Sequence, residues 1–166
     1  MSDILKIIED LIVNHKDDLN AWFATKFKKS RPFFYNSVDI RYSGNKIAAV
    51  DTNIFPAGFN NLSGEAKRTA AKLADEYLNN HFPAANNILL VPELHTRNLN
   101  YLDNITTLKE IISANGKREV IFGSIDPELN DKLNLDLPNG DQIEIQPIYK
   151  DADNVKTKYG FCPDLI

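Results

Sequence analysis

The sequence contains a single cysteine, Cys162, among 166 residues. One cysteine excludes an internal disulfide and any metal site built from several thiolates. No apolar run approaches the roughly 20 residues that cross a bilayer. The amino-terminal segment has acids among its apolar residues and no small-residue cleavage site, unlike a signal peptide. These absences predict a cytoplasmic protein with no membrane partner.

Positive charge is also scarce. The 19 Lys and Arg residues are outnumbered by 23 Asp and Glu residues, so the net charge of −4 predicts no nucleic-acid partner. The sequence has no GxxxxGK[ST] phosphate loop and no GxGxxG after a strand, and the HExxH and GxSxG motifs are absent. Glu93 and His95 come nearest to a metal pair, and without a third ligand they predict no metal site.

The composition is that of a globular domain, with 43% hydrophobic and 25% charged residues. The length predicts a single α/β domain over residues 1–166. Apolar residues at helical spacing predict an amino-terminal helix within 1–30, from about Asp3 to Lys28. Residues 33–53 then predict an antiparallel hairpin about a turn at 43–45.

Strand and helix patterns alternate through the middle of the chain. Buried strands are predicted at 86–92 and 118–125, helices at 65–82 and 98–116, and a half-exposed strand at 142–150. This alternation predicts a mixed, mainly parallel sheet flanked by helices, to which the hairpin adds an antiparallel part. The apolar residues at 165–166 are typical of the start of another buried strand.

The segment 49–63 combines polar and aromatic residues in a way that neither a core strand nor an ordinary loop requires. Asp51 and Asn53 end the apolar return strand, and Asn60 and Asn61 follow in the loop before the next helix. Ligands bind at the carboxyl ends of strands in open α/β sheets, so these residues are candidate substrate contacts. The alternative is a capping loop rich in Asx turns and tied down by two aromatic residues.

A second candidate group follows the next predicted strand, at what we expect to be the same sheet edge. Arg97 offers a planar fork suited to a carboxylate or phosphate, and His95 and Asn98 add hydrogen-bonding groups. Arg41, on the charged face of the hairpin, is a further carboxylate-binding candidate. The alternatives are a helix N-cap by Thr96 or Asn98 and surface ion pairs for the arginines.

Together these groups would suit an α-amino acid. An arginine would bind the carboxylate, Asp51 the ammonium group, and the amides a polar side chain. The residue pattern leaves two other functions open. One is a stand-alone module that binds amino acids or small carboxylates, and the other is a structural or oligomerisation domain.

The same stretches resemble a known family. The strings PFFYNSVDIRYSGNKIAAVDTNIFPAGFNNLS, PELHTRNLNYLDNI and VIFGSID are similar, in this order, to the proteobacterial glutamate–cysteine ligases, which are related to ATP-grasp enzymes. The resemblance covers about Arg31 to Ile166. It implies an enzyme of glutathione synthesis that uses ATP and Mg²⁺ to phosphorylate the γ-carboxylate of glutamate. The amine of cysteine then attacks the acyl phosphate.

The chain is much shorter than the members of that family. The resemblance therefore implies the amino-terminal region of a ligase, a pre-ATP-grasp-like domain that lacks the carboxy-terminal ATP-grasp portion. We expect this chain alone to bind no cofactor and to be inactive, while its catalytic residues and any homo-oligomer stay open. The residues that match the family motifs, and that we predict to bind substrate, are Arg41, Asp51, Asn53, Asn60, Asn61, His95, Arg97 and Asn98.

Overall fold

The computed structural model describes residues 2–30, 33–44, 46–93, 98–137 and 140–166. They form two compact units, Met1–Pro56 and Ala57–Ile166, each with a sheet of its own. The mixed α/β class and the antiparallel hairpin are confirmed. The single domain predicted for 1–166 stays a prediction. No helix in the described ranges has the length and apolar character needed to cross a bilayer.

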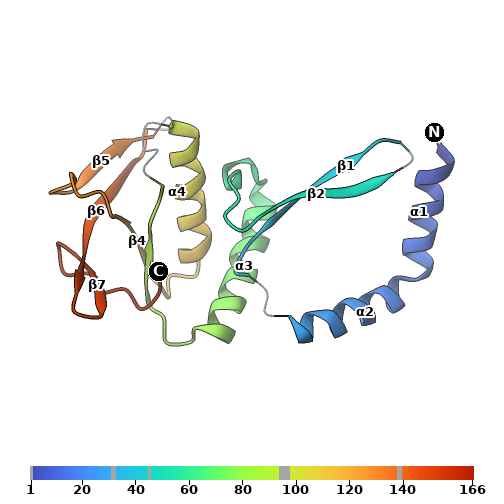
Figure 1. Cartoon of the computed structure of the whole chain (residues 1–166), viewed down its shortest axis with the longest axis horizontal. Coiled ribbons are helices and arrows are strands. Elements are labelled where there is room, and N and C mark those ends of the chain that lie inside the picture. Colours follow the sequence, from blue (N-terminus) through green and yellow to red (C-terminus); the bar gives the residue numbers. More distant parts are fainter. Residues whose placement is uncertain (1, 31–32, 45, 94–97, 138–139) are drawn as a thin grey trace. The chain divides into compact units, whose positions relative to one another are not determined.

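The first unit begins with two helices, α1 (Ser2–Asn14) and α2 (Lys16–Lys29), which follow one another in Figure 1. The sequence predicts one continuous helix, but the chain bends at His15, whose φ is −111°. Helical backbone hydrogen bonds of 3.0 and 2.9 Å continue across this bend. Asn14 and His15 have weak helix propensity and follow the β-branched Val13, which gives a physical reason for the bend.

The hairpin completes the first unit. Its strands, β1 (Ser37–Tyr42) and β2 (Ile47–Asn53), are antiparallel and form a separate two-stranded sheet. The apolar run at 47–50 suggests a strand covered on both faces, yet every residue of β2 is exposed. The expectation is not met, because neither face of this two-stranded sheet is packed against other parts of the described chain closely enough to bury a residue of β2.

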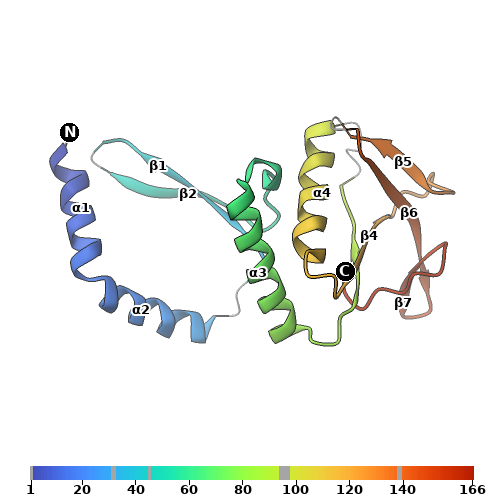
Figure 2. The ribbon, with the colours of Figure 1, turned by 180° about the vertical axis from the view of Figure 1, so that it is seen from behind.

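The second unit places two helices on a mixed sheet. The short 3₁₀ helix η1 (Phe59–Asn61) precedes α3 (Gly64–His81), and α4 (Leu99–Ser113) follows later. The sheet order is β3 (Asn87–Leu90), β4 (Glu119–Ser124), β6 (Gln142–Asp151) and β5 (Leu133–Asp136), and β7 (Asn154–Thr157) pairs with β6. In Figure 1 and Figure 2, α4 lies between α3 and β4.

Strand direction in this sheet follows the predicted alternation only in part. The pairs β3–β4 and β4–β6 are parallel, as a strand–helix–strand order favours. However, β2 lies in a different sheet from β3, so the parallel sheet begins one strand later than the sequence suggests. The sequence analysis missed β5 and β7, both antiparallel to β6. The alternating residues 133–136 are the signal that could have revealed β5.

The core of the second unit lies between α4 and the sheet. Its buried cluster is formed by Leu102, Ile105, Phe122, Leu137, Ile143 and Ile145. On the other face of the sheet the packing leaves no room for a side chain at Gly123. A Cβ there would lie 2.6 Å from Ile148 Cγ2 and 2.8 Å from Leu89 Cδ1, so the position requires glycine.

The last residues of the chain lie along the free edge of β3. Leu165 forms a parallel bridge with Ile88, and the Leu89 N–H donates to the Leu165 carbonyl at 2.9 Å. The Asp164 carboxylate accepts from the backbone N–H groups of Asn86 and Asn87, both at 2.9 Å. These two bonds lower the pKa of Asp164. This pairing is a single bridge and Ile166 is 63% exposed, so the further buried strand stays a prediction.

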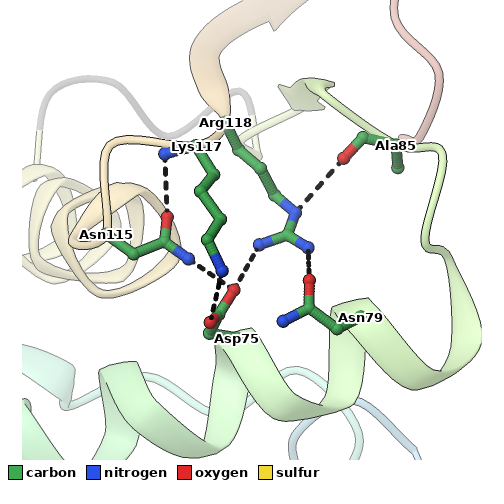
Figure 3. A network of polar contacts seen from close by, with 6 residues as sticks. All are labelled: Asp75, Asn79, Ala85, Asn115, Lys117 and Arg118. Atoms are coloured by element: carbon green, nitrogen blue, oxygen red, sulfur yellow. Dashed lines mark hydrogen bonds and ion pairs between the residues drawn. The ribbon is translucent and has the colours of Figure 1, made fainter.

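The buried guanidinium of Arg118 connects three segments of the second unit (Figure 3). Its side chain is 3% exposed and donates to Asp75 Oδ1 at 2.7 Å and to Asn79 Oδ1 at 2.6 Å, both on α3. Its Nε donates to the Ala85 carbonyl at 3.2 Å, in the connection from α3 to β3. Because Arg118 directly precedes β4, these bonds fix α3 and the following connection against the sheet.

Asp75 has two further partners in this network (Figure 3). The Asn115 side-chain amide donates to its Oδ1, and the Lys117 ammonium lies 3.4 Å from its Oδ2. The hydrogen bond from Arg118 is the largest cause that lowers the pKa of Asp75, with smaller contributions from Lys117. The carboxylate therefore stays ionised across the neutral range and balances the buried arginine.

Replacement of Arg118 tests this network. Arg118→Met removes three hydrogen bonds and takes from Asp75 its buried cationic partner, so we expect the free energy of unfolding to fall by about 3 kcal/mol. Urea unfolding at pH 7 measures the change. Lys72→Met is the matched control, since Lys72 is 77% exposed and pairs with Glu76 on the same helix. An equal effect of the two substitutions would contradict the proposed role of Arg118.

The lowered pKa of Asp75 predicts a pH dependence. A carboxylate whose pKa is lower in the folded state contributes stability above its unfolded pKa, and this contribution is lost as the pH falls through the folded pKa. We expect Asp75→Asn to differ most in stability from the wild type at pH 7 and least at about pH 3. Urea unfolding at both values measures the difference. A stability difference that stays constant with pH, or an equal pH dependence in the exposed control Glu110→Gln, would exclude the Asp75 carboxylate as the cause.

Candidate functional site

A β-bulge in the hairpin sets which side chains share a face. Asp39 pairs with Asp51, but the next residue, Ile40, pairs with Ala49. Val50 is therefore an extra residue in β2. In a regular strand, residues 47, 49, 51 and 53 would lie on one face, because side chains alternate with a period of two. The extra residue moves Asp51 and Asn53 to the opposite face.

The bulge gives the hairpin a polar face and an apolar face, since directly paired residues point the same way. The polar hairpin face carries Ser37, Asp39, Arg41, Ala48, Asp51 and Asn53. The apolar hairpin face carries Val38, Ile40, Tyr42, Ile47, Ala49 and Thr52. Three predicted substrate-binding residues, Arg41, Asp51 and Asn53, are thus brought together on one exposed face.

The polar hairpin face contains a carboxylate pair. Asp39 lies directly opposite Asp51, and like charges in this position destabilise a hairpin. Asp51 accepts from the Thr52 N–H at 2.9 Å and from the Asn53 amide at 3.3 Å, which orients its oxygens. A cationic group between the carboxylates would relieve their repulsion, and Arg41 on the same face could bind an anion. The arrangement can therefore hold a molecule with both charges.

The sequence analysis missed Asp39 as a site residue. The alternation of β1 already places it beside Arg41. Its position opposite Asp51 depends on the bulge, which leaves no mark in the composition of β2. The expectation that Asp51 and the residues after β3 meet at one sheet edge is not met, because β2 and β3 belong to different sheets.

The loop before α3 is anchored by a buried amide that the sequence analysis also missed. Asn104, on α4 and 5% exposed, accepts with its Oδ1 from the Gly58 N–H at 2.6 Å and from the Phe59 N–H at 2.8 Å. Gly58 has φ +104°, a conformation that glycine adopts without strain. A polar residue at a buried helix position is the sequence signal for such an anchor.

This anchor places Asn60 and Asn61 in η1, at the surface of the second unit. Asn61 is exposed and Asn60 is half-buried. The Ser63 side chain accepts from the Ala66 N–H at 3.2 Å and caps α3. Phe59 is half-buried, but Phe55 is 81% exposed and so does not pack into a core. The boundary between the units falls after Pro56, inside the segment 49–63.

The second predicted group lies only partly within the described residues. Asn98 caps α4, because its Oδ1 accepts from the Asn100 N–H at 3.1 Å and from the Tyr101 N–H at 3.4 Å. An N-cap by Asn98 is one of the alternatives that the sequence leaves open. The predicted contact of Asn98 with substrate stays a prediction. His95 and Arg97 lie outside the described residues, so their predicted roles stay predictions.

A small hollow lies at the carboxyl ends of β3 and β4, where ligands bind in many α/β sheets. Glu93, Ser124 and Asp126 line it together with apolar side chains. The Ser124 hydroxyl accepts from the Asp126 N–H at 3.1 Å, and the Tyr101 hydroxyl accepts from the Glu93 N–H at 2.7 Å. Burial raises the pKa of Tyr101, which keeps its hydroxyl neutral. At about 40 Å³, the hollow has room for a few water molecules but not for an amino acid.

The sequence and the fold match known proteins. A family model described as glutamate-cysteine ligase matches residues 9–166. A solved structure from Methylobacillus flagellatus KT, assigned as a gamma-glutamylcysteine synthetase, is 32% identical with a TM-score of 0.90. The match covers 97% of this chain and 38% of that chain. No curated protein matches the chain significantly.

The Asn104 anchor gives a prediction for the loop at 58–61. Asn104→Ala removes the acceptor of two backbone N–H groups, a change worth about 1–3 kcal/mol. We expect hydrogen exchange at the Gly58 and Phe59 amides to become about tenfold to a hundredfold faster. Amide exchange followed by NMR measures this. Glu110→Ala, an exposed position on the same helix, is the control, and unchanged exchange in Asn104→Ala would show that the loop is held by other contacts.

Proposed function

The chain belongs to the glutamate–cysteine ligase family, and from this premise we propose that it is the amino-terminal region of an ATP-dependent ligase that forms γ-glutamylcysteine. This reaction is the first step of glutathione synthesis. The observation that carries the proposal is the family match over residues 9–166, together with a solved relative of which this chain spans 38%. Its location in the cytoplasm and any homo-oligomer stay predictions.

The proposal assigns glutamate recognition to the polar hairpin face. The Arg41 fork suits a carboxylate, and the facing carboxylates of Asp39 and Asp51 suit the ammonium group of an α-amino acid. The bulge supports this assignment because it brings these opposite charges to one face. The remaining predicted contacts are Asn53, Asn60, Asn61, His95, Arg97 and Asn98.

The chemistry of such a ligase also needs ATP and Mg²⁺, which supply the phosphoryl group that activates the γ-carboxylate of glutamate. Magnesium requires near-octahedral oxygen ligands. Within the described ranges, no three His, Cys, Asp or Glu side chains are grouped to hold a metal ion. The described residues therefore provide no dedicated cage of protein ligands for Mg²⁺. We place the nucleotide and the metal on a carboxy-terminal portion outside these 166 residues.

Glutamate binding tests the substrate assignment. We expect weak binding of glutamate to this chain, with NMR shifts at the hairpin, and no binding of ATP. Arg41→Met or Asp51→Asn should each weaken glutamate binding at least about tenfold, since each removes a charge-assisted contact. The exposed residues Arg68 and Asp153 provide the matched controls, Arg68→Met and Asp153→Asn. Unchanged affinity in the Arg41 and Asp51 variants, in a folded protein, would overturn the assignment.

An activity assay tests the ligase itself. Residues 1–166, incubated with glutamate, cysteine, ATP and Mg²⁺, should form no γ-glutamylcysteine by mass spectrometry. A fusion of these residues to the part of the M. flagellatus chain outside the match should form it. Product from the 166 residues alone would overturn the fragment proposal. Tight glutamate binding together with an inactive fusion would favour a stand-alone binding module.

A further inference from the structure

The first unit has no hydrophobic core in this structure. None of its residues in the ranges 4–30, 33–44 and 46–56 is buried. A small unit without buried apolar residues lacks the core that would keep it folded by itself, so it needs a disulfide, a metal or a partner. It contains no cysteine, and among its described residues no three His, Asp or Glu side chains are grouped to hold a metal ion. Of these three, contact with a partner surface remains as the way to stabilise the first unit.

The apolar hairpin face is an exposed surface suited to such a contact. Val38, Ile40, Tyr42 and Ile47 lie on it and are 46–65% exposed. A two-stranded hairpin is marginally stable in water unless a third strand or a packed face supports it. The opposite face carries charged residues, so only the apolar hairpin face would gain free energy from burial.

We propose that the apolar hairpin face is the docking surface for the carboxy-terminal portion of the same ligase chain. This inference rests on the proposed function. The solved relative contains the fold of this chain, at 97% coverage, within a chain of which more than half lies outside the match. A large part of that longer polypeptide is therefore available to cover the hairpin.

The size of the face favours a covalently linked occupant over a second copy. Stable interfaces between separate proteins take about 20–30 residues from each side. The apolar hairpin face offers the six positions of one side of a two-stranded ribbon. A surface this small binds a separate protein weakly, whereas a linked segment is present at a high effective concentration. The occupant should present apolar side chains, because the face offers few polar groups.

The fusion described above provides the test. We expect the amides of β1 and β2 to exchange at least about tenfold more slowly in the fusion than in residues 1–166 alone. Ile40→Asp in the fusion should abolish this protection, and Ile40→Val should retain it. The matched control is Ile125→Asp in the second unit, since Ile40 is 65% and Ile125 is 67% exposed. Circular dichroism verifies that each variant is folded.

Three results would overturn the proposal. Hairpin exchange could be equally fast in the fusion and in the isolated chain. Ile40→Asp could leave the protection in the fusion intact. Residues 1–166 alone could form a dimer by light scattering that Ile40→Asp dissociates, which would assign the face to a second copy. Exchange is measured without substrates, so a protected hairpin in an inactive fusion would support docking while the proposed activity fails.

Discussion

The guanidinium of Arg118 holds together three segments that the chain order separates. It binds Asp75 and Asn79 on α3 and the carbonyl of Ala85, while its own backbone leads into β4. A buried cation is costly unless its charge and its donors are satisfied, and here a carboxylate, an amide and a carbonyl satisfy them. The position of α3 therefore depends on an electrostatic requirement as well as on apolar burial.

The fixed α3 helix in turn constrains the segment that precedes it. The chain enters α3 through the Ser63 cap, and the residues before the cap are bound by Asn104 on α4. Arg118 thus binds the second half of α3, while Asn104 binds the loop that leads into its first turn. Apolar packing alone is less directional, whereas hydrogen bonds specify the atoms that meet. The loop at 58–61 owes its defined conformation to this arrangement.

Local sequence signals predicted much of the fold. The helix predicted at 65–82 corresponds to α3, the predicted hairpin corresponds to β1 and β2, and the apolar strands β3 and β4 were visible as short runs. Features that depend on distant partners were not predictable in the same way. The bend at His15 and the Asn104 anchor depend on local propensities and on contacts that the spacing of apolar residues does not record.

The candidate site also combines features that the sequence predicts with features that depend on strand pairing. Arg41, Asp51 and Asn53 were recognisable as polar residues at strand positions. They share a face because Val50 bulges out of the ladder and has no partner on β1. Asp39 became a candidate only through its partner across the hairpin. The assignment of β2 to its own sheet could not be read from the alternation of strands and helices, because pairing between strands is a property of the tertiary structure.

The bulge at Val50 allows β2 to carry one extra residue without mixing its two faces. If Val50 were lost, the strand would alternate regularly, and Asp51 and Asn53 would still lie on the face of Arg41. If Val50 instead paired as a regular strand residue, Asp51 and Asn53 would move to the face of Ile40, although no residue had been substituted. Comparisons among relatives should therefore ask which residues pair across the hairpin, since a relative that is one residue shorter at this point keeps the same two surfaces.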